Sequence, residues 1–169
     1  CHTLLSKPTL STYNRSQTIM THDTPLTLTA QHLAKEQQTL LRKFYRSHNS
    51  PMRITPQAQT WVVRAPNIIT GLCLSPIDQA YWLTSLFTAP QYRFSGAARF
   101  LLEHLQLIYQ DTPIWLFCHP DLGSFYRKLG FRETQDLPQT LSQRLQRYQQ
   151  HKLLIAMSNH PLAEKPQLT

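Results

Sequence analysis

Long apolar segments are missing from this 169-residue chain, and their absence argues against a membrane protein. No apolar run approaches the ~20 residues that a helix needs to cross a bilayer. The N-terminal segment also lacks the apolar core of a secretory signal. We therefore expect a soluble, cytoplasmic protein without a membrane partner.

Cysteine is also scarce, and its spacing excludes a disulfide framework. The three cysteines, Cys1, Cys73 and Cys118, are an odd set without a CxxC pair, which favours a reducing compartment. The eight histidines show no HxxxH pair or other spacing typical of metal ligands, so we expect no metal site. The sequence has neither a GxSxG elbow nor a Walker loop, and it gives no support to serine-hydrolase or P-loop chemistry.

Acidic residues are the third shortage. The chain has nine aspartates and glutamates against 17 lysines and arginines, which gives a net charge of +8. The basic residues are scattered in singles and pairs, so nucleic acid is disfavoured as the main ligand, and a small polyanion such as coenzyme A fits better. The lack of carboxylates also disfavours a polycationic amine, which needs them to replace its lost hydration.

What is present is the composition of one globular domain. Hydrophobic residues make up 41% and charged residues 15% of the chain, which is typical of a folded protein. A chain of this length suits a single domain that buries roughly 70% of its unfolded surface. The expected organisation is a flexible N-terminal extension over residues 1–24, a domain over 25–158 and a C-terminal tail over 159–169.

Periodicity and turn residues predict a mixed α/β sheet with helices on both faces. A short alternating segment predicts a first strand, and apolar residues at helical spacing predict a helix directly after it. An irregular connector over 48–59 leads to three strands in an antiparallel meander, after which helices and strands alternate. The predicted strands are 26–29, 60–64, 68–74, 80–88, 113–118, 131–134 and 153–157, and the predicted helices are 30–45, 96–110, 122–129 and 137–150.

The segment 89–99, between the third meander strand and a helix, is the most informative motif. Small residues at 95–98 allow a ligand to approach the backbone closely. The first amides of a helix have no partner inside the helix, and the helix dipole adds positive potential. These features predict an anion site suited to a pyrophosphate, with added charge from Arg93 and Arg99. The structural alternative is a plain turn in which Gly96 only avoids a clash.

Two motifs resemble signatures of the GNAT superfamily of N-acetyltransferases. The pattern Arg93-x-x-Gly96-x-Ala98 is similar to its Arg/Gln-x-x-Gly-x-Gly/Ala signature, and residues 125–131 (FYRKLGF) resemble its second signature, a Tyr followed by a Gly-Phe pair. The order of the predicted elements also fits. The resemblance therefore covers residues 25–158.

The resemblance implies a mostly antiparallel sheet with a V-shaped opening between two parallel central strands, which end at Thr88 and Cys118. The pantetheine arm of acetyl-CoA would bind there as an added strand, and backbone amides would polarise its thioester carbonyl. The implied reaction is direct attack of a primary amine, on a small molecule or a peptide, upon the thioester. The implied cofactor-binding residues are Leu86, Phe87, Thr88, Arg93, Phe94, Ser95, Gly96, Ala97, Ala98, Arg99 and His119.

The resemblance also assigns a general acid. Tyr126 falls at the family position whose hydroxyl protonates the departing thiolate, with a packed core aromatic as the alternative. His119 stands where many relatives have an Asn that touches pantetheine, so it is either a replacement donor or a surface histidine. Cys118 lies near the implied thioester, but packing is favoured over an acyl-cysteine.

A general base is not evident, because residues 80–88 contain neither a carboxylate nor a histidine. Either Tyr81, Thr84 and Ser85 relay a proton through water, or the amine arrives neutral. We expect a neutral or anionic acceptor, bound between the connector, the end of the first helix and the last two strands. A non-catalytic acetyl-CoA sensor and a basic nucleic-acid-associated protein are the alternative functions. The oligomeric state stays open, with a homodimer as one alternative.

Overall fold

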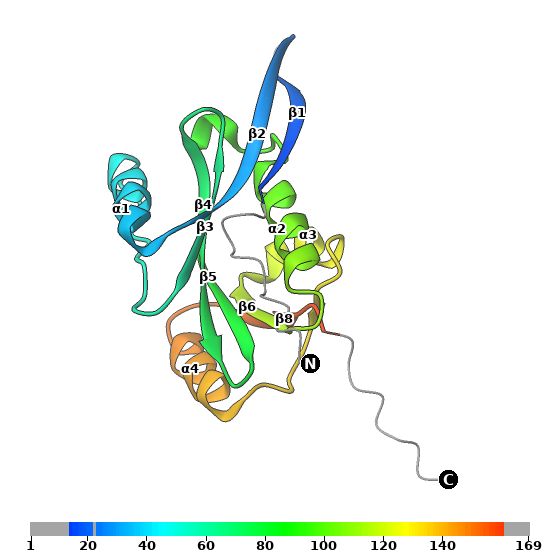
Figure 1. The fold of residues 1–169 in the computed structure, drawn as a ribbon. Helices are drawn as coiled ribbons and strands as arrows, with labels where there is room; N and C mark the ends of the chain where they lie inside the picture. The colour runs from blue at the N-terminus through cyan, green and yellow to red at the C-terminus, as the bar shows by residue number, and fades with distance from the viewer. Residues whose placement is uncertain (1–13, 22, 161–169) are drawn as a thin grey trace, which may run out of the picture. The chain divides into compact units, whose positions relative to one another are not determined.

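A computed structural model describes residues 14–21 and 23–160, which form two compact units (Figure 1). Of the described residues, the first unit includes those up to Cys73 and the segment Ser85–Ile108, and the second includes Leu74–Thr84 and those from Tyr109 to His160. The eight strands follow the order β1-β2-β3-β4-β5-β6-β8-β7. No helix among the described residues is long and apolar enough to cross a membrane.

The first unit is built on strands that are neighbours both along the chain and in the sheet. Strands β1 and β2 form a hairpin whose pairing runs from Arg15↔Ala30 to Thr21↔Thr24, and β2 pairs antiparallel with β3 from Thr29↔Arg64 to Leu33↔Thr60. Strands β4 and β5 follow in the sheet order and continue into the second unit. The bounds are β1 (Arg15–Thr21), β2 (Thr24–Leu33), β3 (Gln59–Arg64), β4 (Ile68–Ile77) and β5 (Ala80–Thr88).

Two sequence predictions fail in this unit. Residues 15–21 were expected in a flexible extension but form β1, while residues 1–13 lie outside the described part. The helix predicted from residue 30 begins only at Gln38, because β2 continues to Leu33. Over so short a segment, the spacing of the buried residues Leu28, Ala30 and Leu33 fits either a strand or a helix. The hydrogen-bonded pairing with β3 stabilises the strand.

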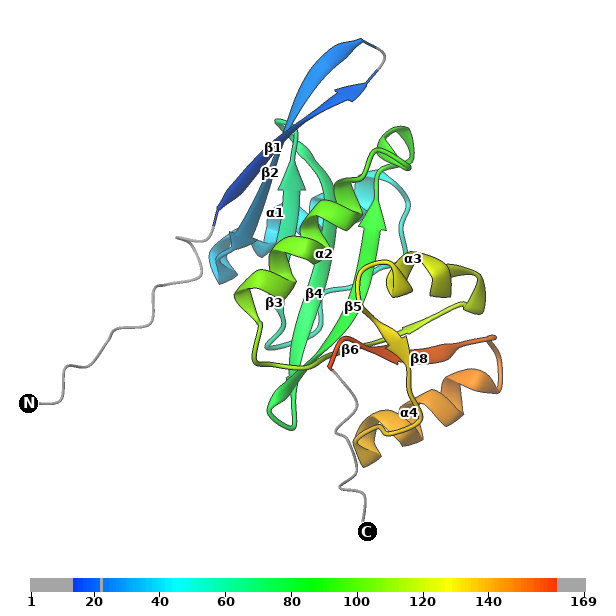
Figure 2. The same cartoon turned by 90° about the vertical axis from the view of Figure 1, so that its right-hand side faces the viewer.

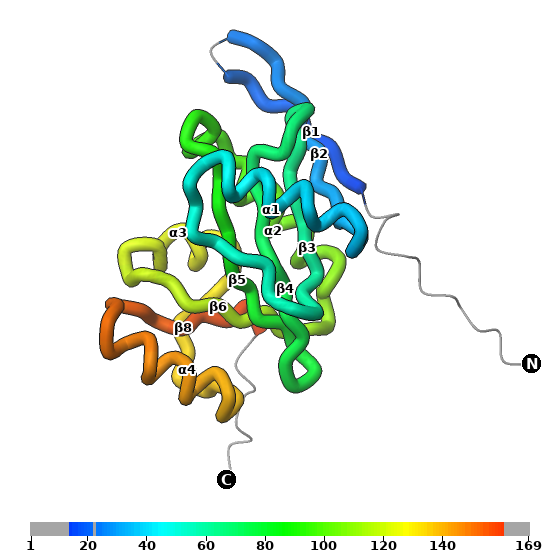
Figure 3. Tube along the Cα trace, turned by 90° about the vertical axis from the view of Figure 1, so that its left-hand side faces the viewer, coloured from blue at the N-terminus to red at the C-terminus, as the bar shows by residue number. Residues whose placement is uncertain are grey.

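Two helices cover opposite faces of these strands. Helix α1 (Gln38–Ser47) lies in front of them in Figure 3, and helix α2 (Ala97–Ile108) lies in front of them in the opposite view of Figure 2. Each helix buries one apolar stripe: Leu41, Phe44 and Tyr45 on α1, and residues such as Phe100 and Leu101 on α2. Short 3-10 turns, η2 (Lys35–Gln37) and η3 (Pro90–Tyr92), precede the two helices.

The second unit holds the parallel pair of the sheet. Strand β5 pairs parallel with β6 from Tyr81↔Ile114 to Leu83↔Leu116, and β8 pairs antiparallel with both β6 and β7. The predicted parallel central pair in a mostly antiparallel mixed sheet is therefore confirmed. The bounds are β6 (Ile114–Cys118), η4 (Pro120–Leu122), α3 (Gly123–Arg127), β7 (Arg132–Glu133), α4 (Gln139–Gln149) and β8 (Ile155–Ser158).

Successive side chains of β6 point to opposite faces of the sheet, and each face is near one of the two helices of this unit. Phe117 contacts Tyr148 of α4, with ring centroids 6.3 Å apart. Its neighbour Cys118 is close enough to Tyr126 of α3 to affect the pKa of that phenol. The predicted order of elements after the meander is confirmed, although helix 122–129 is divided into η4 and α3.

Helix α1 approaches the sheet closely at a glycine. A Cβ atom added at Gly71 of β4 would collide with the Cδ1 atom of Leu41, which is fully buried. The missing side chain therefore lets α1 lie directly on β4. This close contact fixes the helix that carries Tyr45 and the arginines described below.

We predict that Gly71→Val destabilises the protein by about 1–3 kcal/mol because the new side chain overpacks the Leu41 contact. Leu41→Ala should cost about 2–5 kcal/mol through a cavity. The double variant should be at least about 1 kcal/mol more stable than the sum of the single effects, since valine fills the space that leucine leaves. Urea unfolding of the four proteins measures this coupling, and strictly additive effects would contradict the contact.

Candidate functional site

The end of β5 is held in an unusual conformation. Ser85 has φ of 60° three residues before the end of the strand at Thr88, a left-handed conformation of the kind found at β-bulges. Its backbone oxygen accepts a 2.6 Å hydrogen bond from the Tyr45 hydroxyl, and its own hydroxyl donates to the Arg53 carbonyl at 2.7 Å. Helix α1, the connector and β5 are thus joined at one residue.

The strand residues after this bulge are those predicted to hold a cofactor arm. Leu86, Phe87 and Thr88 are half-buried. The Thr88 hydroxyl lies 3.1 Å from that of Thr70 on β4, which fixes the end of the strand. Main-chain groups of these three residues are the ones that the resemblance assigns to the pantetheine arm.

The turn that follows is shaped by two residues with positive φ. Phe94 has φ of 64° and a fully exposed side chain, and Gly96 has φ of 89°. No atom lies within 4 Å of the place where a Cβ at Gly96 would stand. The glycine therefore does not avoid a clash inside the protein: its backbone conformation requires it, and the space that a side chain would fill is open.

Helix α2 begins at this open space. Ala97 and Ala98 provide its first amides, and the Ala97 amide donates to the Ser95 hydroxyl at 3.3 Å. The amide of Phe100 bonds the Gly96 carbonyl at 2.9 Å and begins the helical ladder. A positive helix end beside a small-residue turn is a suitable cradle for a phosphate group.

The two arginines of the motif have partners in this conformation. The Arg93 guanidinium lies 5.7 Å from the Phe87 ring centroid, and its Nε donates to the Thr88 carbonyl at 3.4 Å. Arg99 pairs with Glu103 at 2.9 Å, one helical turn further along α2. Both side chains are exposed, so these contacts are weak ones that an anion can replace.

The remaining predicted residues belong to the second unit. Tyr126 is buried, with its ring 5.7 Å from that of Phe131. Burial, and to a lesser extent Cys118, raises the pKa of Tyr126 well above its ordinary value. The phenol is therefore protonated at neutral pH, as a general acid must be, and it also packs in the core.

His119 caps the turn that leads to α3. Its Nδ1 accepts a 3.1 Å hydrogen bond from the Asp121 amide, which assigns the proton of the neutral ring to Nε2. Cys118 is buried, with its Sγ 3.7 Å from the Met157 sulfur. Burial raises the pKa of Cys118 to about 11, against a smaller lowering by Arg127. A protonated, packed thiol agrees with the structural role favoured for this residue.

The three hydroxyls considered for a proton relay differ in their surroundings. The Tyr81 ring stacks on Tyr109 with centroids 4.9 Å apart, and Ser85 already donates to the Arg53 carbonyl. The Thr84 hydroxyl is buried without a hydrogen-bond partner. Among the described residues, β5 offers no carboxylate or imidazole.

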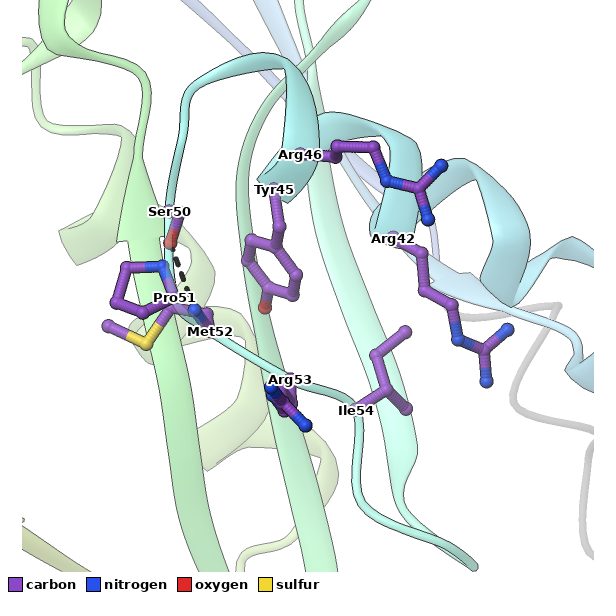
Figure 4. A pocket seen from close by; sticks show the side chains of 8 residues that line it. All are labelled: Arg42, Tyr45, Arg46, Ser50, Pro51, Met52, Arg53 and Ile54. Atoms are coloured by element: carbon purple, nitrogen blue, oxygen red, sulfur yellow. Dashed lines mark hydrogen bonds between the residues drawn. The ribbon is translucent and has the colours of Figure 1, made fainter.

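Sequence reasoning missed one residue of an arginine-lined pocket of about 510 Å³ beside α1 (Figure 4). Arg42, Arg46 and Arg53 line it together with Tyr45. The connector 48–59, which contains Arg53, and the end of the first helix, with Tyr45 and Arg46, were expected near the acceptor, whereas Arg42 was not. The available signal was the (i, i+4) spacing of Arg42 and Arg46 on one helix face.

Comparisons with known proteins agree with this architecture. Residues 56–133 match the family model described as Acetyltransferase (GNAT) domain. No curated protein matches the chain.

Solved structures show the same fold at low identity. Naa50 of Arabidopsis thaliana, in complex with the bisubstrate analogue CoA-Ac-MVNAL, is 16% identical with a TM-score of 0.59, over 79% of this chain and 99% of that one. The ribosomal-protein-S18-alanine N-acetyltransferase of Escherichia coli is 17% identical with a TM-score of 0.52, over 78% and 92%.

N-acetylglutamate synthase from Neisseria gonorrhoeae, complexed with coenzyme A and N-acetyl-glutamate, is 12% identical with a TM-score of 0.54. This alignment covers 79% of the present chain but only 35% of that chain. The family match and the shared fold lead to one conclusion: residues 56–133 are similar in sequence to the GNAT acetyltransferase domain, which is typical of acyl-CoA-dependent N-acyltransferases, and the chain has the fold of these solved structures.

Proposed function

We propose that this protein transfers the acetyl group of acetyl-CoA to a primary amine of a small molecule or a peptide. The observation that carries the proposal is the turn at Gly96, where a positive φ, open space and the start of α2 coincide. Similar proteins crystallised with coenzyme A, or with an analogue that contains it, give further support.

The cofactor phosphates would be held mainly by backbone. The amides of Gly96, Ala97 and Ala98 would donate to a phosphate in the open space beside Gly96, and a pyrophosphate would replace the Ser95 hydroxyl as the partner of the Ala97 amide. Arg93 and Arg99 would exchange their weak surface contacts for charged phosphate oxygens. Phe94, fully exposed beside them, offers an apolar surface for the adenosine end.

The thioester would lie along the end of β5. Residues 86–88 present strand backbone to the pantetheine arm, so the arm adds as a short strand. An amide near Leu86 would donate to the thioester carbonyl as its oxygen gains negative charge. His119, with its proton on Nε2, would donate to an amide oxygen of the arm.

The reaction exchanges one bond for another. The neutral amine attacks the carbonyl carbon, a C–N bond forms, the C–S bond breaks, and the thiolate receives a proton from Tyr126. The attacking nitrogen loses its extra proton to solvent as the amide forms, and the Tyr126 phenolate regains a proton from solvent, so no protein base is required when the amine arrives neutral. Because β5 lacks a carboxylate and a histidine, an acetyl-CoA sensor without activity is the second candidate.

We predict that Gly96→Glu lowers coenzyme A affinity more than Gly96→Gln. Both side chains carry the same backbone strain at positive φ and nearly the same volume, but only glutamate places negative charge at the phosphates. The difference should reach at least about tenfold in Kd by calorimetry, on the scale of a charged hydrogen bond. Pantetheine, which lacks the phosphates, should bind both variants equally. Equal loss of coenzyme A affinity in both would remove the phosphate assignment.

We predict that Tyr126→Phe lowers kcat at least about tenfold, within the range of general-acid catalysis, while acetyl-CoA affinity changes by less than about 1 kcal/mol. The ring stays and fills the same space, so packing is preserved. Since burial keeps the phenol protonated, the ratio of wild-type to variant kcat should be the same at pH 7 and pH 9.

Tyr148→Phe is the matched control, because it removes a phenol hydroxyl from α4 of the same unit. It should leave kcat unchanged. An unaltered kcat in Tyr126→Phe would make Tyr126 a packing residue only. Binding of acetyl-CoA without thiol release against any amine would favour the sensor.

A further inference from the structure

The pocket beside α1 is built almost entirely from cations and apolar groups. Arg42 and Arg46 extend to the same side of α1, and Arg53 comes from the connector below the Tyr45 ring (Figure 4). Among the described residues, none of the three guanidinium groups forms an ion pair. The three positive charges therefore have no compensation from the described part of the protein.

The sequence around the pocket keeps negative charge away. No aspartate or glutamate occurs between Glu36 and Asp78, while this stretch contains the three arginines. Guanidinium groups held near one another repel, and they are stabilised by an anion that they share. Arginine offers paired N–H donors in a planar fork that matches a carboxylate.

The pocket lies directly beside the bulge of β5. The hydroxyl of Tyr45, one of its lining residues, donates to the Ser85 carbonyl, and the main-chain carbonyl of Arg53 accepts a hydrogen bond from the Ser85 hydroxyl. Two lining residues of the pocket are thus bonded to Ser85, which directly precedes residues 86–88, where the proposed function places the thioester.

The titratable groups behind the pocket stay uncharged. Burial, followed by the effect of Cys73, raises the pKa of the lining residue Tyr45 above its usual range. Burial also raises the pKa of Cys73 to about 11, although contacts with Tyr45, Thr55 and Ser85 and the charge of Arg42 oppose this rise. Both groups stay neutral, so they add no negative charge to oppose the arginines.

We infer that this pocket binds a carboxylate of the acceptor, and that the acceptor is therefore an amine that carries a carboxylate. The inference rests on the proposed function and narrows its substrate class. Amino acids and peptides with an acidic residue near the N-terminus both have this chemistry. The carboxylate would pair with Arg46 and Arg53 while the amine faces the end of β5.

Turnover of matched acceptors tests the substrate class. Three pairs differ by one carboxylate: alanine and alaninamide, glutamate and glutamine, and the peptide amides Ala-Glu-Ala-NH₂ and Ala-Gln-Ala-NH₂. We expect the carboxylate member of at least one pair to have a kcat/KM at least about tenfold higher. The pair that responds identifies an amino acid or a peptide as the source. Equal rates within all three pairs would overturn the inference and leave the acetyltransferase function intact.

Variants assign the preference to the pocket. Arg46→Gln and Arg53→Gln should raise KM for the preferred acceptor about fivefold or more, with little change in kcat. Lys43→Gln is the matched control, since it removes one charge from α1 at a residue that does not line this pocket. Coenzyme A affinity should be unchanged in all three variants. A fall in coenzyme A affinity in the arginine variants would show that the pocket serves the cofactor, and would overturn the inference.

Direct binding separates this inference from the proposed function. Glutarate, a dicarboxylate without an amine, can be titrated calorimetrically into the protein saturated with coenzyme A. Binding by wild type and Lys43→Gln that is weakened in Arg46→Gln and Arg53→Gln would support the pocket even if no amine were acetylated. Absence of binding to wild type, or equal binding to all variants, would contradict it.

Discussion

A hydrogen bond from the buried hydroxyl of Tyr45 to the main-chain oxygen of Ser85, 2.6 Å long, connects the parts of the proposed site in the first unit. It links a helix to a strand and provides a partner for the carbonyl of a strand residue with positive φ. The Ser85 hydroxyl also donates to the Arg53 carbonyl, so the connector is held at the same residue. A buried phenol has to find a partner, and here that need fixes α1 against β5.

These hydrogen bonds at Ser85 support both parts of the proposed site. On one side, residues 86–88 continue to the turn at Gly96, where open space adjoins the first amides of α2. On the other side, Tyr45 forms part of the arginine-lined pocket. The proposed cofactor and acceptor sites of this unit therefore have one common support, and their separation is set by a few residues of a single strand.

Much of this arrangement was predictable because its causes are local. The turn at Gly96 follows from small residues before an amphipathic helix, and that pattern is visible in the sequence. The parallel pairing of β5 with β6 was implied by the resemblance to the GNAT signatures. The extent of β2 was not predictable, since Ala30 and Leu33 fit a helix equally well until β3 supplies a partner ladder.

The acceptor side depends on tertiary contacts that no local pattern encodes. The main chain at Arg53 is bonded by Ser85, a residue 32 positions away in the chain. Close approach of α1 at Gly71 likewise depends on the fit with Leu41. The scarcity of acidic residues pointed to a neutral or anionic acceptor, without indicating which arginines are involved.

The central claim is that the backbone from β5 to the start of α2 holds acetyl-CoA, and amide NMR of the labelled wild-type protein tests it most directly. Titration with coenzyme A should shift the amide signals of Gly96, Ala97 and Ala98, and those of Leu86 and Thr88. Titration with pantetheine should shift only the signals of Leu86 and Thr88. Unchanged signals at residues 96–98 with saturating coenzyme A, or identical responses to both ligands, would contradict the account.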